Sequence, residues 1–366
     1  MGTYKIRTYK DMFDKMGPER VAKLKHDLEE IVRKKRVLLT GASGFFGSHM
    51  LRHLLMNTNW EVVCICSWKH KGTPERVDNA LEGQDKSRVK VITHDLESPL
   101  TERTKKRLGK IDYILNIASN SHVDRSIEDP APFVVGNVQL VVNMLDLARE
   151  LKPELFLQFS TDEVYGPAPE GVDFPEWSTI LPSNPYSASK AAQEAIAFSY
   201  WRTYGIPLVI TNTMNLMGQT QDPEKYPAQL IRKIQNGDEV VVHGKPDDIG
   251  SRYYIHARNA ADAVLYIINN LPPKHYVEDK VMRPDRYNIV GETELNNLEL
   301  AEMTARLLGK ELRYKFMDFH AGRPGHDRRY ALSGQKLKDL GWKPPEDFEK
   351  SLKSTIEWTL KNPHWL

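Results

Sequence analysis

Tyr186 and Lys190 are the first residues in this sequence whose types and spacing suit chemistry. A separation of four residues places both side chains on one face of a helix. A phenol with a pKa of about 10 is a poor base at neutral pH, but a neighbouring ammonium group favours the phenolate and lowers that pKa. The pair therefore suits removal of a proton from a hydroxyl group while a hydride leaves the same carbon. Taken alone, the Tyr-x-x-x-Lys pattern is common and carries little weight.

Asp162 and Glu163 form a second pair, shortly after the apolar run Leu155–Phe159. Sheets of parallel strands place their reactive groups at the carboxyl ends of the strands. The surroundings can hold two adjacent carboxyl groups in opposite protonation states, so that one acts as an acid and the other as a base. The alternative is structural, because two acids at a strand end can also cap a helix.

A glycine-rich loop, Gly41-Ala-Ser-Gly-Phe-Phe-Gly47, directly follows the apolar run Val37–Leu39 and opens an amphipathic segment. Residues without a Cβ allow the backbone to approach a pyrophosphate, and the helix N-terminus then offers free N–H groups to the phosphates. The alternative is a close helix–strand crossing. The context after a strand favours dinucleotide binding, with loop contacts from Gly41, Ser43, Gly44, Phe45, Phe46 and Gly47.

The end of the second strand, Cys66, is where a carboxylate would select NAD over NADP. The residues that follow include Ser67 and Lys69 but no acid, so the sequence leans slightly toward NADP. Asp95, after the third strand, is placed to accept a hydrogen bond from the adenine amino group. The other expected cofactor contacts are Leu96, Ala118, Ser119, Asn137, Tyr186 and Lys190.

The elements that must position these residues alternate between short apolar runs and amphipathic segments. Strands are expected at Val37–Leu39, Glu61–Cys66, Val89–Ile92, Ile111–Leu115, Leu155–Phe159 and Pro207–Thr211. Helices are expected from the glycine loop to about Met56, at Leu298–Leu308 and near Phe348–Leu360. Apolar strands separated by helices predict an α/β fold, a doubly wound parallel sheet (Rossmann) with a second, smaller α/β lobe.

The predicted organisation has three parts. Residues 1–34 form an N-terminal helical extension whose apolar stripe packs within the subunit or on a second one. Residues 35–212 form the NAD(P)-binding domain. Residues 213–366 form the second, smaller domain, with some segments expected to return to the first domain.

Composition excludes several classes of protein. The 366 residues are 40% hydrophobic and 27% charged, with a net charge of +2, so no global field recruits nucleic acid or an anionic membrane. The N-terminus is polar, and no apolar stretch was expected to approach the roughly 20 residues that span a bilayer. Two cysteines, Cys64 and Cys66, suggest reduced thiols in a cytoplasmic protein, and no ligand pattern suggests a metal.

Several motifs together resemble the extended short-chain dehydrogenase/reductase family, and within it the nucleotide-sugar 4,6-dehydratases. The likeness runs from about residue 36 to the C-terminus. It rests on the glycine loop and on the segments Ser121–Ile127, Ser160–Gly166, Asn184–Lys190 and Arg323–Tyr330.

The resemblance implies a reaction and its residues. NAD(P) would oxidise the sugar at C4, water would leave across C5–C6, and hydride would return to C6, which regenerates a tightly held cofactor at each turnover. Glu163 would be the base at C5, Asp162 the acid for the C6 hydroxyl, and Thr161 a hydrogen-bond donor to the 4-oxygen. The resemblance also implies a homodimer. Substrate contacts would come from Ser121, His122, Thr161, Asn215, Lys225, Arg252, Arg323 and His326.

The sequence departs from this branch at several recognition positions. Cys66 replaces the cofactor acid, Asn120 replaces an acid before Ser121, and the stretches beginning at Asn215 and Arg252 differ from the family pattern. The substrate could therefore carry another nucleotide or an N-acetylated sugar. Two rival functions remain open, a nucleotide-sugar 4-epimerase or 5,6-dehydratase, and a non-catalytic NAD(P)-binding regulatory protein.

Overall fold

A parallel sheet with helices on both faces dominates the computed structural model, which describes residues 20, 34–273, 275–278, 281–318 and 327–366. Its eight strands have the order β11-β12-β6-β5-β4-β1-β2-β3, and every neighbouring pair except β11–β12 is parallel. The strands are β1 (Arg36–Thr40), β2 (Glu61–Cys66), β3 (Val89–Thr93), β4 (Tyr113–Asn116), β5 (Leu155–Thr161), β6 (Leu208–Thr213), β11 (His275–Glu278) and β12 (Val281–Ile289).

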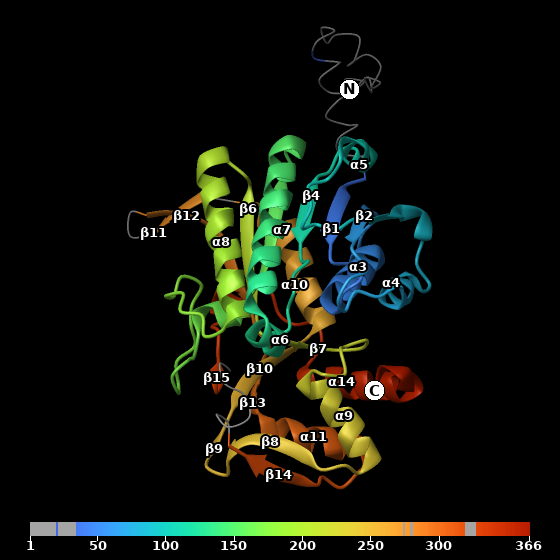
Figure 1. Cartoon of the computed structure of the whole chain (residues 1–366), viewed down its shortest axis with the longest axis vertical. Helices are drawn as coiled ribbons and strands as arrows, with labels where there is room; N and C mark the ends of the chain where they lie inside the picture. The colour runs from blue at the N-terminus through green and yellow to red at the C-terminus, as the bar shows by residue number, and fades with distance from the viewer. Residues whose placement is uncertain (1–19, 21–33, 274, 279–280, 319–326) are drawn as a thin grey trace, which may run out of the picture. The chain divides into compact units, whose positions relative to one another are not determined.

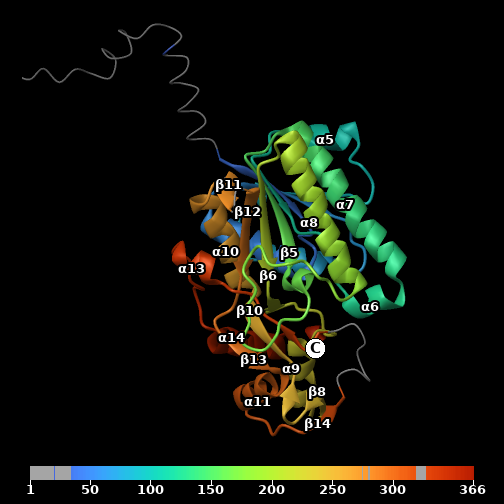
Figure 2. The same cartoon turned by 90° about the vertical axis from the view of Figure 1, so that its left-hand side faces the viewer.

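Two helical layers cover this sheet, and Figure 2 shows them on opposite sides of the strands. One layer contains α3 (Phe45–Asn57) and α10 (Ala257–Asn270), which contact each other. The other contains α7 (Pro130–Leu151) and α8 (Pro185–Tyr204), which pack side by side (Figure 1). Each layer closes its own apolar core against the strands, and this arrangement confirms the predicted doubly wound fold. The shorter helices are α4 (Pro74–Leu81), α5 (Glu102–Leu108), α6 (Val123–Glu128) and the 3₁₀ turns η1 (Lys86–Arg88) and η2 (Asp162–Tyr165).

A smaller lobe lies beyond the carboxyl ends of the central strands (Figure 1). Two small sheets form it, β13-β10-β15 with β7 beside β10, and β14-β8-β9. Its strands are β7 (Asn215–Met217), β8 (Val240–Lys245), β9 (Asp248–Ile249), β10 (Ser251–His256), β13 (Glu294–Asn296), β14 (Tyr314–Met317) and β15 (Arg329–Tyr330). Its helices are α9 (Tyr226–Asn236), α11 (Asn297–Leu308) and α14 (Phe348–Lys361), and the chain also contains α13 (Gln335–Asp339) and η3 (Pro363–Trp365).

The chain crosses between the two parts more than once. After β6 it enters the small lobe, returns as α10, β11 and β12, and then leaves again. Because β12 pairs with β6 in the central sheet, residues 213–366 are not one contiguous lobe. The helix expected in residues 1–34 lies outside the described residues, apart from Arg20 and Lys34.

Helix α7 corrects one expectation from the sequence. It has 22 residues, and its most apolar window has a mean hydropathy of 1.4, so by length and composition it could cross a membrane. Half of that window is buried within the protein, mainly against α8 and the sheet. Core helices of soluble proteins have the same properties.

Candidate active site

The turn between β1 and α3 brings backbone very close to backbone. Gly41 has a φ of +74°, and a Cβ there would lie 3.0 Å from the Ala118 backbone. A Cβ on Gly47 would lie 1.9 Å from the Gly41 carbonyl oxygen, so only glycine fits. Gly44 precedes α3 without a side-chain cap, which leaves N–H groups at the helix start directed at the cleft.

A cleft of about 380 Å³ opens beside this turn, at the carboxyl ends of the strands. It is lined by almost all of the expected cofactor residues, namely Gly41, Ser43, Gly44, Phe45, Phe46, Gly47, Ser67, Lys69, Asp95, Leu96, Ala118, Ser119, Tyr186 and Lys190. Asn137 is the exception. It is fully buried behind the cleft wall, where its side-chain oxygen accepts hydrogen bonds from the Ser119 hydroxyl (3.1 Å) and the Asn120 N–H (2.8 Å).

The loop after β2 carries cationic groups to the rim of this cleft. Lys69, His70 and Lys71 all line it, whereas Cys66 is fully buried and contributes no charge. Lys69 forms an ion pair with Asp95, which lowers the pKa of that carboxyl. Asp95 therefore already has a partner at the position where an adenine amino group was expected.

The acid pair lies at the end of β5, in the turn η2. The Thr161 hydroxyl donates to Asp162 Oδ1 at 2.8 Å, and the Asn184 amide donates to Glu163 Oε2 at 3.2 Å. Asn184 also caps α8, with its side chain bonded to the Ser187 N–H, so the start of that helix is tied to the acid pair. The sequence analysis gave Asn184 no role, although its place before Pro185 is a typical helix-start signal.

Tyr186 and Lys190 point into the same cleft from the first turns of α8, as their spacing predicts. The Tyr186 N–H donates to Ser126 Oγ at 3.1 Å, which fixes the first turn of α8 against α6. The Lys190 ammonium donates to the carbonyl oxygen of Phe159 at 2.7 Å. The Phe159 ring in turn stacks on Phe46 of the glycine-turn helix, with ring centroids 4.2 Å apart.

The surroundings act differently on the pKa values of the Asp162 and Glu163 carboxyl groups. Burial and the charge of Glu163 raise the pKa of Asp162 to about 7. Burial also raises the pKa of Glu163, but the Asn184 hydrogen bond and the charges of Lys225 and Arg252 oppose that effect. The pKa of Asp162 thus lies near neutrality, while Lys225 and Arg252 favour the charged form of Glu163.

Burial also controls the other pair. It lowers the pKa of Lys190 to about 8 and raises the pKa of Tyr186, to which the charges of Glu163 and Asp162 add. Without a ligand the phenol is therefore held neutral. A further positive charge in the cleft is needed to favour phenolate at neutral pH.

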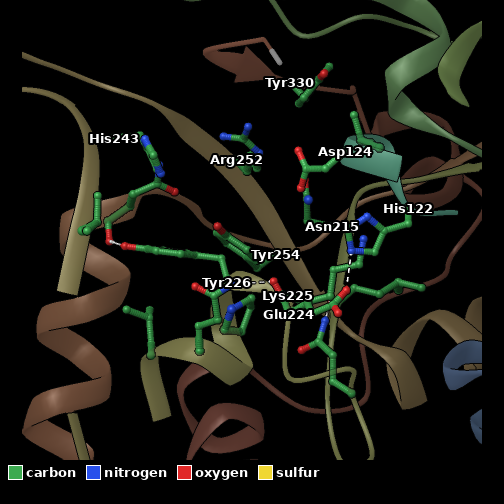
Figure 3. Close-up of a pocket in the computed structure, with 18 of the residues that line it drawn as sticks. His122, Asp124, Asn215, Glu224, Lys225, Tyr226, His243, Arg252, Tyr254 and Tyr330 are labelled. Carbon is green, nitrogen blue, oxygen red and sulfur yellow. Dashed lines mark hydrogen bonds and ion pairs between the residues drawn. The ribbon is translucent and has the colours of Figure 1, made fainter. Parts of the chain in front are cut away.

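A second cavity of about 280 Å³ continues from the cleft into the small lobe. Figure 3 shows Arg252 and Tyr330 on one side of it, with His122 and Glu224 on another. His122, Asn215 and Lys225 line both cavities, Arg252 lines the second, and Ser121 and Thr161 line the first. Arg323 and His326 lie outside the described residues.

Sequence reasoning missed several residues of this second cavity. Glu224 forms an ion pair with His122 at 2.7 Å, and the Tyr226 hydroxyl donates to the Asn297 carbonyl oxygen at 2.9 Å. Arg252 stacks over the Tyr330 ring, with its guanidinium 5.2 Å from the ring centroid. Glu224 directly precedes the predicted contact Lys225, and this was the one sequence feature that could have pointed to it. An acidic residue beside cationic ones does not suggest a site for a diphosphate.

Several buried polar atoms around these cavities have no hydrogen-bond partner among the described residues. They include Ser160 Oγ, Asp162 Oδ2, Asn215 Oδ1, His122 Nδ1 and Arg252 Nη1. Buried polar atoms are normally paired, and an unpaired one costs free energy. Their convergence on one continuous cleft fits a polar ligand, and the glycine turn fits a dinucleotide.

Comparison with known proteins agrees with this geometry. Residues 38–355 match the family model described as GDP-mannose 4,6 dehydratase. The chain belongs to this family. A curated relative, dTDP-glucose 4,6-dehydratase from Escherichia coli, is 32% identical over 357 residues, which cover 90% of this chain and 94% of that protein.

Solved structures in and near the GDP-mannose 4,6-dehydratase family share the fold. A dTDP-glucose 4,6-dehydratase from Streptomyces venezuelae, solved with NAD bound, has a TM-score of 0.77 and 30% identity, and covers 90% of this chain and 98% of its own. UDP-glucose 4-epimerase from Thermus thermophilus, in complex with NAD, also has a TM-score of 0.77, with 27% identity over 88% of this chain and 98% of its own. The fold alone therefore does not separate dehydratases from epimerases, and the side chains of the cleft must do so.

Proposed function

We propose that this protein is a nucleotide-sugar 4,6-dehydratase that converts a nucleotide-diphosphate hexose to its 4-keto-6-deoxy product. The observation that carries the proposal is the Asp162–Glu163 pair, which lies in the same cleft as Tyr186 and Lys190, with the pKa of both carboxyls raised and that of Asp162 raised to about 7. An epimerase acts at C4 alone and needs no acid–base pair. A dehydratase needs both members of the pair.

The roles of the side chains follow from their positions. Tyr186 takes the proton of the C4 hydroxyl, and Lys190 lies one turn away with its ammonium group in the same cleft. A bound nicotinamide would supply the hydride acceptor and donor that the side chains lack. Glu163, whose charged form is favoured by Lys225 and Arg252, removes the C5 proton, which the C4 ketone has made acidic. Protonated Asp162 gives its proton to the departing C6 hydroxyl, while Thr161 orients the Asp162 carboxyl.

The substrate's diphosphate would lie in the second cavity. Lys225 and Arg252 supply positive charge there, and Arg252 has one N–H group without a partner among the described residues. A guanidinium can bind phosphate oxygens in a bidentate manner, so Arg252 is suited to this contact. Arg323 and His326 stay predicted contacts.

The test is incubation with UDP-, dTDP-, CDP- and GDP-hexoses, followed by mass spectrometry. A dehydratase gives a product lighter by one water molecule, whereas an epimerase gives no change in mass. Trapping with hydroxylamine then separates the two dehydratase products, because a 4-keto sugar forms an oxime and a 5,6-alkene with an intact C4 hydroxyl does not. A bound cofactor with no turnover of any hexose would indicate the non-catalytic alternative.

The structural relatives bind a nicotinamide dinucleotide, which supports a cofactor of this class here. We propose that the form bound by this chain is NADP and that it is retained through purification. Cys66 supplies no carboxylate against a 2′-phosphate, and Lys69 and His70 line the adjacent rim. The structural relatives bind NAD, so this preference would distinguish the chain from them. Denatured protein should release NADP, and release of NAD alone would overturn the preference.

We further propose a cytoplasmic homodimer that joins through α7 and α8. Val135 on α7 and Tyr204 on α8 are 66% and 49% exposed, so each of these helices offers apolar surface to a second subunit. Light scattering at micromolar concentration should give twice the mass of the chain, and a monomer would contradict the proposal. Cell fractionation tests the compartment.

A further inference from the structure

Lys190 is held by a residue with no assigned role in the proposed reaction. Gln193 lies one turn further along α8 and is fully buried. Its side-chain oxygen accepts a hydrogen bond from the Lys190 ammonium at 2.7 Å, the same length as the bond to Phe159. Since a buried ammonium is costly without acceptors, the Gln193 amide replaces water around this charge.

Gln193 is the end of a hydrogen-bonded chain that runs beneath the cleft. Its oxygen also accepts from Gln158 Nε2 at 3.0 Å, and Gln158 Oε1 accepts from Asn116 Nδ2 at 2.8 Å. Asn116 Oδ1 accepts from the Thr40 hydroxyl at 3.1 Å. All four side chains are fully buried and come from α8, β5, β4 and β1 in turn. The chain thus crosses three adjacent strands of the sheet.

Both ends fix the orientation of every amide in this chain. An ammonium has only donors, so Gln193 must present its oxygen to Lys190, and its Nε2 donates to the Asn137 carbonyl oxygen at 2.7 Å. At the other end, the Thr40 hydroxyl accepts the N–H groups of Ile117 (2.9 Å) and Ala118 (3.0 Å). Its proton is therefore donated onward to Asn116. A flip of any one amide would oppose two donors or two acceptors.

The far end of the chain lies at the cofactor turn. Thr40 directly precedes Gly41, and the Ala118 backbone packs where a Gly41 Cβ would lie. The Thr40 hydroxyl is therefore both the last member of the hydrogen-bonded chain and a direct contact of the Ala118 backbone in the cleft wall. Networks of buried, fully paired polar groups of this kind are rigid.

Glu194 is the charged group that acts on the pKa of Lys190. Its carboxylate raises that pKa, but it also forms a fully buried ion pair with Arg286 and accepts from Asn212. Tyr186 lies one turn earlier on the same helix and is held neutral by burial. Neutral acceptors, Gln193 and the Phe159 carbonyl, therefore supply the direct hydrogen bonds to the ammonium.

We propose that Gln193 is a positioning residue that fixes the place and charge of Lys190, and that Gln158, Asn116 and Thr40 tie it to the glycine turn. The catalytic importance of Lys190 rests on the proposed function. The placement of Lys190 by Gln193 does not, because it concerns the protein without substrate.

The test replaces Gln193 with methionine, which keeps the length of the side chain and removes the acceptor. The charge of Lys190 is followed in cofactor-free protein by NMR of isotope-labelled lysine ε-carbons, with the Lys190 signal assigned by its loss in Lys190→Met. Wild-type Lys190 should titrate with a pKa of about 8. In Gln193→Met that midpoint should fall by roughly one pH unit, because a hydrogen bond to the charged form has been lost.

Two further variants separate positioning from packing. Gln193→Glu keeps an acceptor and adds negative charge, so its midpoint should rise, whereas a packing defect would move both variants the same way. Gln158→Met breaks the next link and should lower the midpoint by less than Gln193→Met. Thr304→Val, a buried hydroxyl loss in α11, should leave the midpoint unchanged.

Activity gives the second readout. In a plot of kcat against pH, the midpoint of the alkaline limb should move to lower pH in Gln193→Met and to higher pH in Gln193→Glu. An unmoved NMR midpoint in Gln193→Met and Gln158→Met would overturn the positioning role, whatever the enzyme's substrate. A moved midpoint with no dehydration of any hexose would instead count against the proposed function and leave the positioning role intact.

Discussion

Buried polar atoms are hydrogen-bonded at one end of the cleft, whereas several at the other end have no partner among the described residues. Beneath the cofactor turn, the Lys190 ammonium and the Gln193 amide are bonded to protein partners. At the substrate end, Asp162 Oδ2, Asn215 Oδ1 and Arg252 Nη1 have no partner among the described residues. The first end is preorganised by the fold. The second is completed only when a polar ligand arrives, so substitutions at the two ends should differ in kind.

The largest expected effect is on the elimination step. Glu163→Gln leaves Tyr186 and Lys190 intact, so it should still oxidise C4 while it forms dehydrated product about 10²–10⁴-fold more slowly. Reduced nicotinamide should then accumulate and be visible by its near-ultraviolet absorbance. Tyr186→Phe should show no transient reduction, because the group that takes the C4 proton is absent.

The Glu163 variant decides the assignment of the base. Dehydration by Glu163→Gln at the wild-type rate would mean that Glu163 is not the base. Glu170→Gln, an exposed acid in the loop after η2, is the matched control and should behave like wild type.

The next effect is on stability and belongs to the preorganised end. Arg286 and Glu194 are both buried, and the Arg286 guanidinium also donates to the Tyr165 hydroxyl at 3.1 Å. Arg286→Met leaves the Glu194 carboxylate buried without its counter-ion, which should lower the free energy of unfolding by about 3–5 kcal/mol. Urea unfolding measures this change.

The charge-matched control for the buried pair is Arg306→Met. Arg306 forms an exposed ion pair with Glu349, and exposed pairs contribute little. Equal losses of stability in the two variants would contradict the view that the buried Arg286–Glu194 pair stabilises the fold more than an exposed ion pair does.

A smaller effect is expected at the substrate end, in binding. Arg252→Leu removes the guanidinium that faces the second cavity. Loss of one charge-assisted contact to a diphosphate should raise KM about ten- to a hundredfold with a smaller change in kcat. Lys233→Leu is the control, since Lys233 also lines this cavity from α9 but, unlike Arg252, is not among the charges that act on Glu163. An unchanged KM in Arg252→Leu would place the diphosphate elsewhere.

The sequence predicted the glycine turn, six strands of the central sheet and the helix that carries Tyr186 and Lys190, because each is written in local periodicity or spacing. It did not predict β12. That strand contains Pro284, Asp285 and Arg286, which read as a polar loop, and it becomes a buried strand because Arg286 meets Glu194 from 92 residues earlier. Long-range pairing of this kind leaves no local pattern.

The same limit applies to the site. Gln193 looks like an ordinary polar residue on a helix, and only the sheet brings Gln158 and Asn116 beneath it. Asn137 is another expected cofactor residue, but α7 places it behind the cleft wall. The chemical pairs were predictable because their residues are near each other along the chain.

The last expected effect is the free-energy cost of a buried Asp162 carboxyl whose pKa is raised. Its pKa is about 7 in the folded protein, whereas an unfolded aspartate has a pKa of about 3.9. Between these values the folded state binds the proton more tightly, so stability falls as pH rises from about 4 through about 7. Asp162→Asn removes this titration and keeps an oxygen that can accept from Thr161. The cofactor-free variant should therefore gain stability over wild type, by up to about 4 kcal/mol at about 1.36 kcal/mol per pKa unit, at pH 8 but not at pH 4.

Urea unfolding of the two cofactor-free proteins at several pH values measures this difference, with Asp339→Asn at an exposed position as control. A difference that does not change with pH would mean that Asp162 titrates alike in the folded and unfolded states. The acid role would then lose its physical basis. A gain that grows as pH rises from about 4 to about 7, together with slower dehydration, would show that the substrate end loses stability because it holds the Asp162 carboxyl where its charged form is disfavoured.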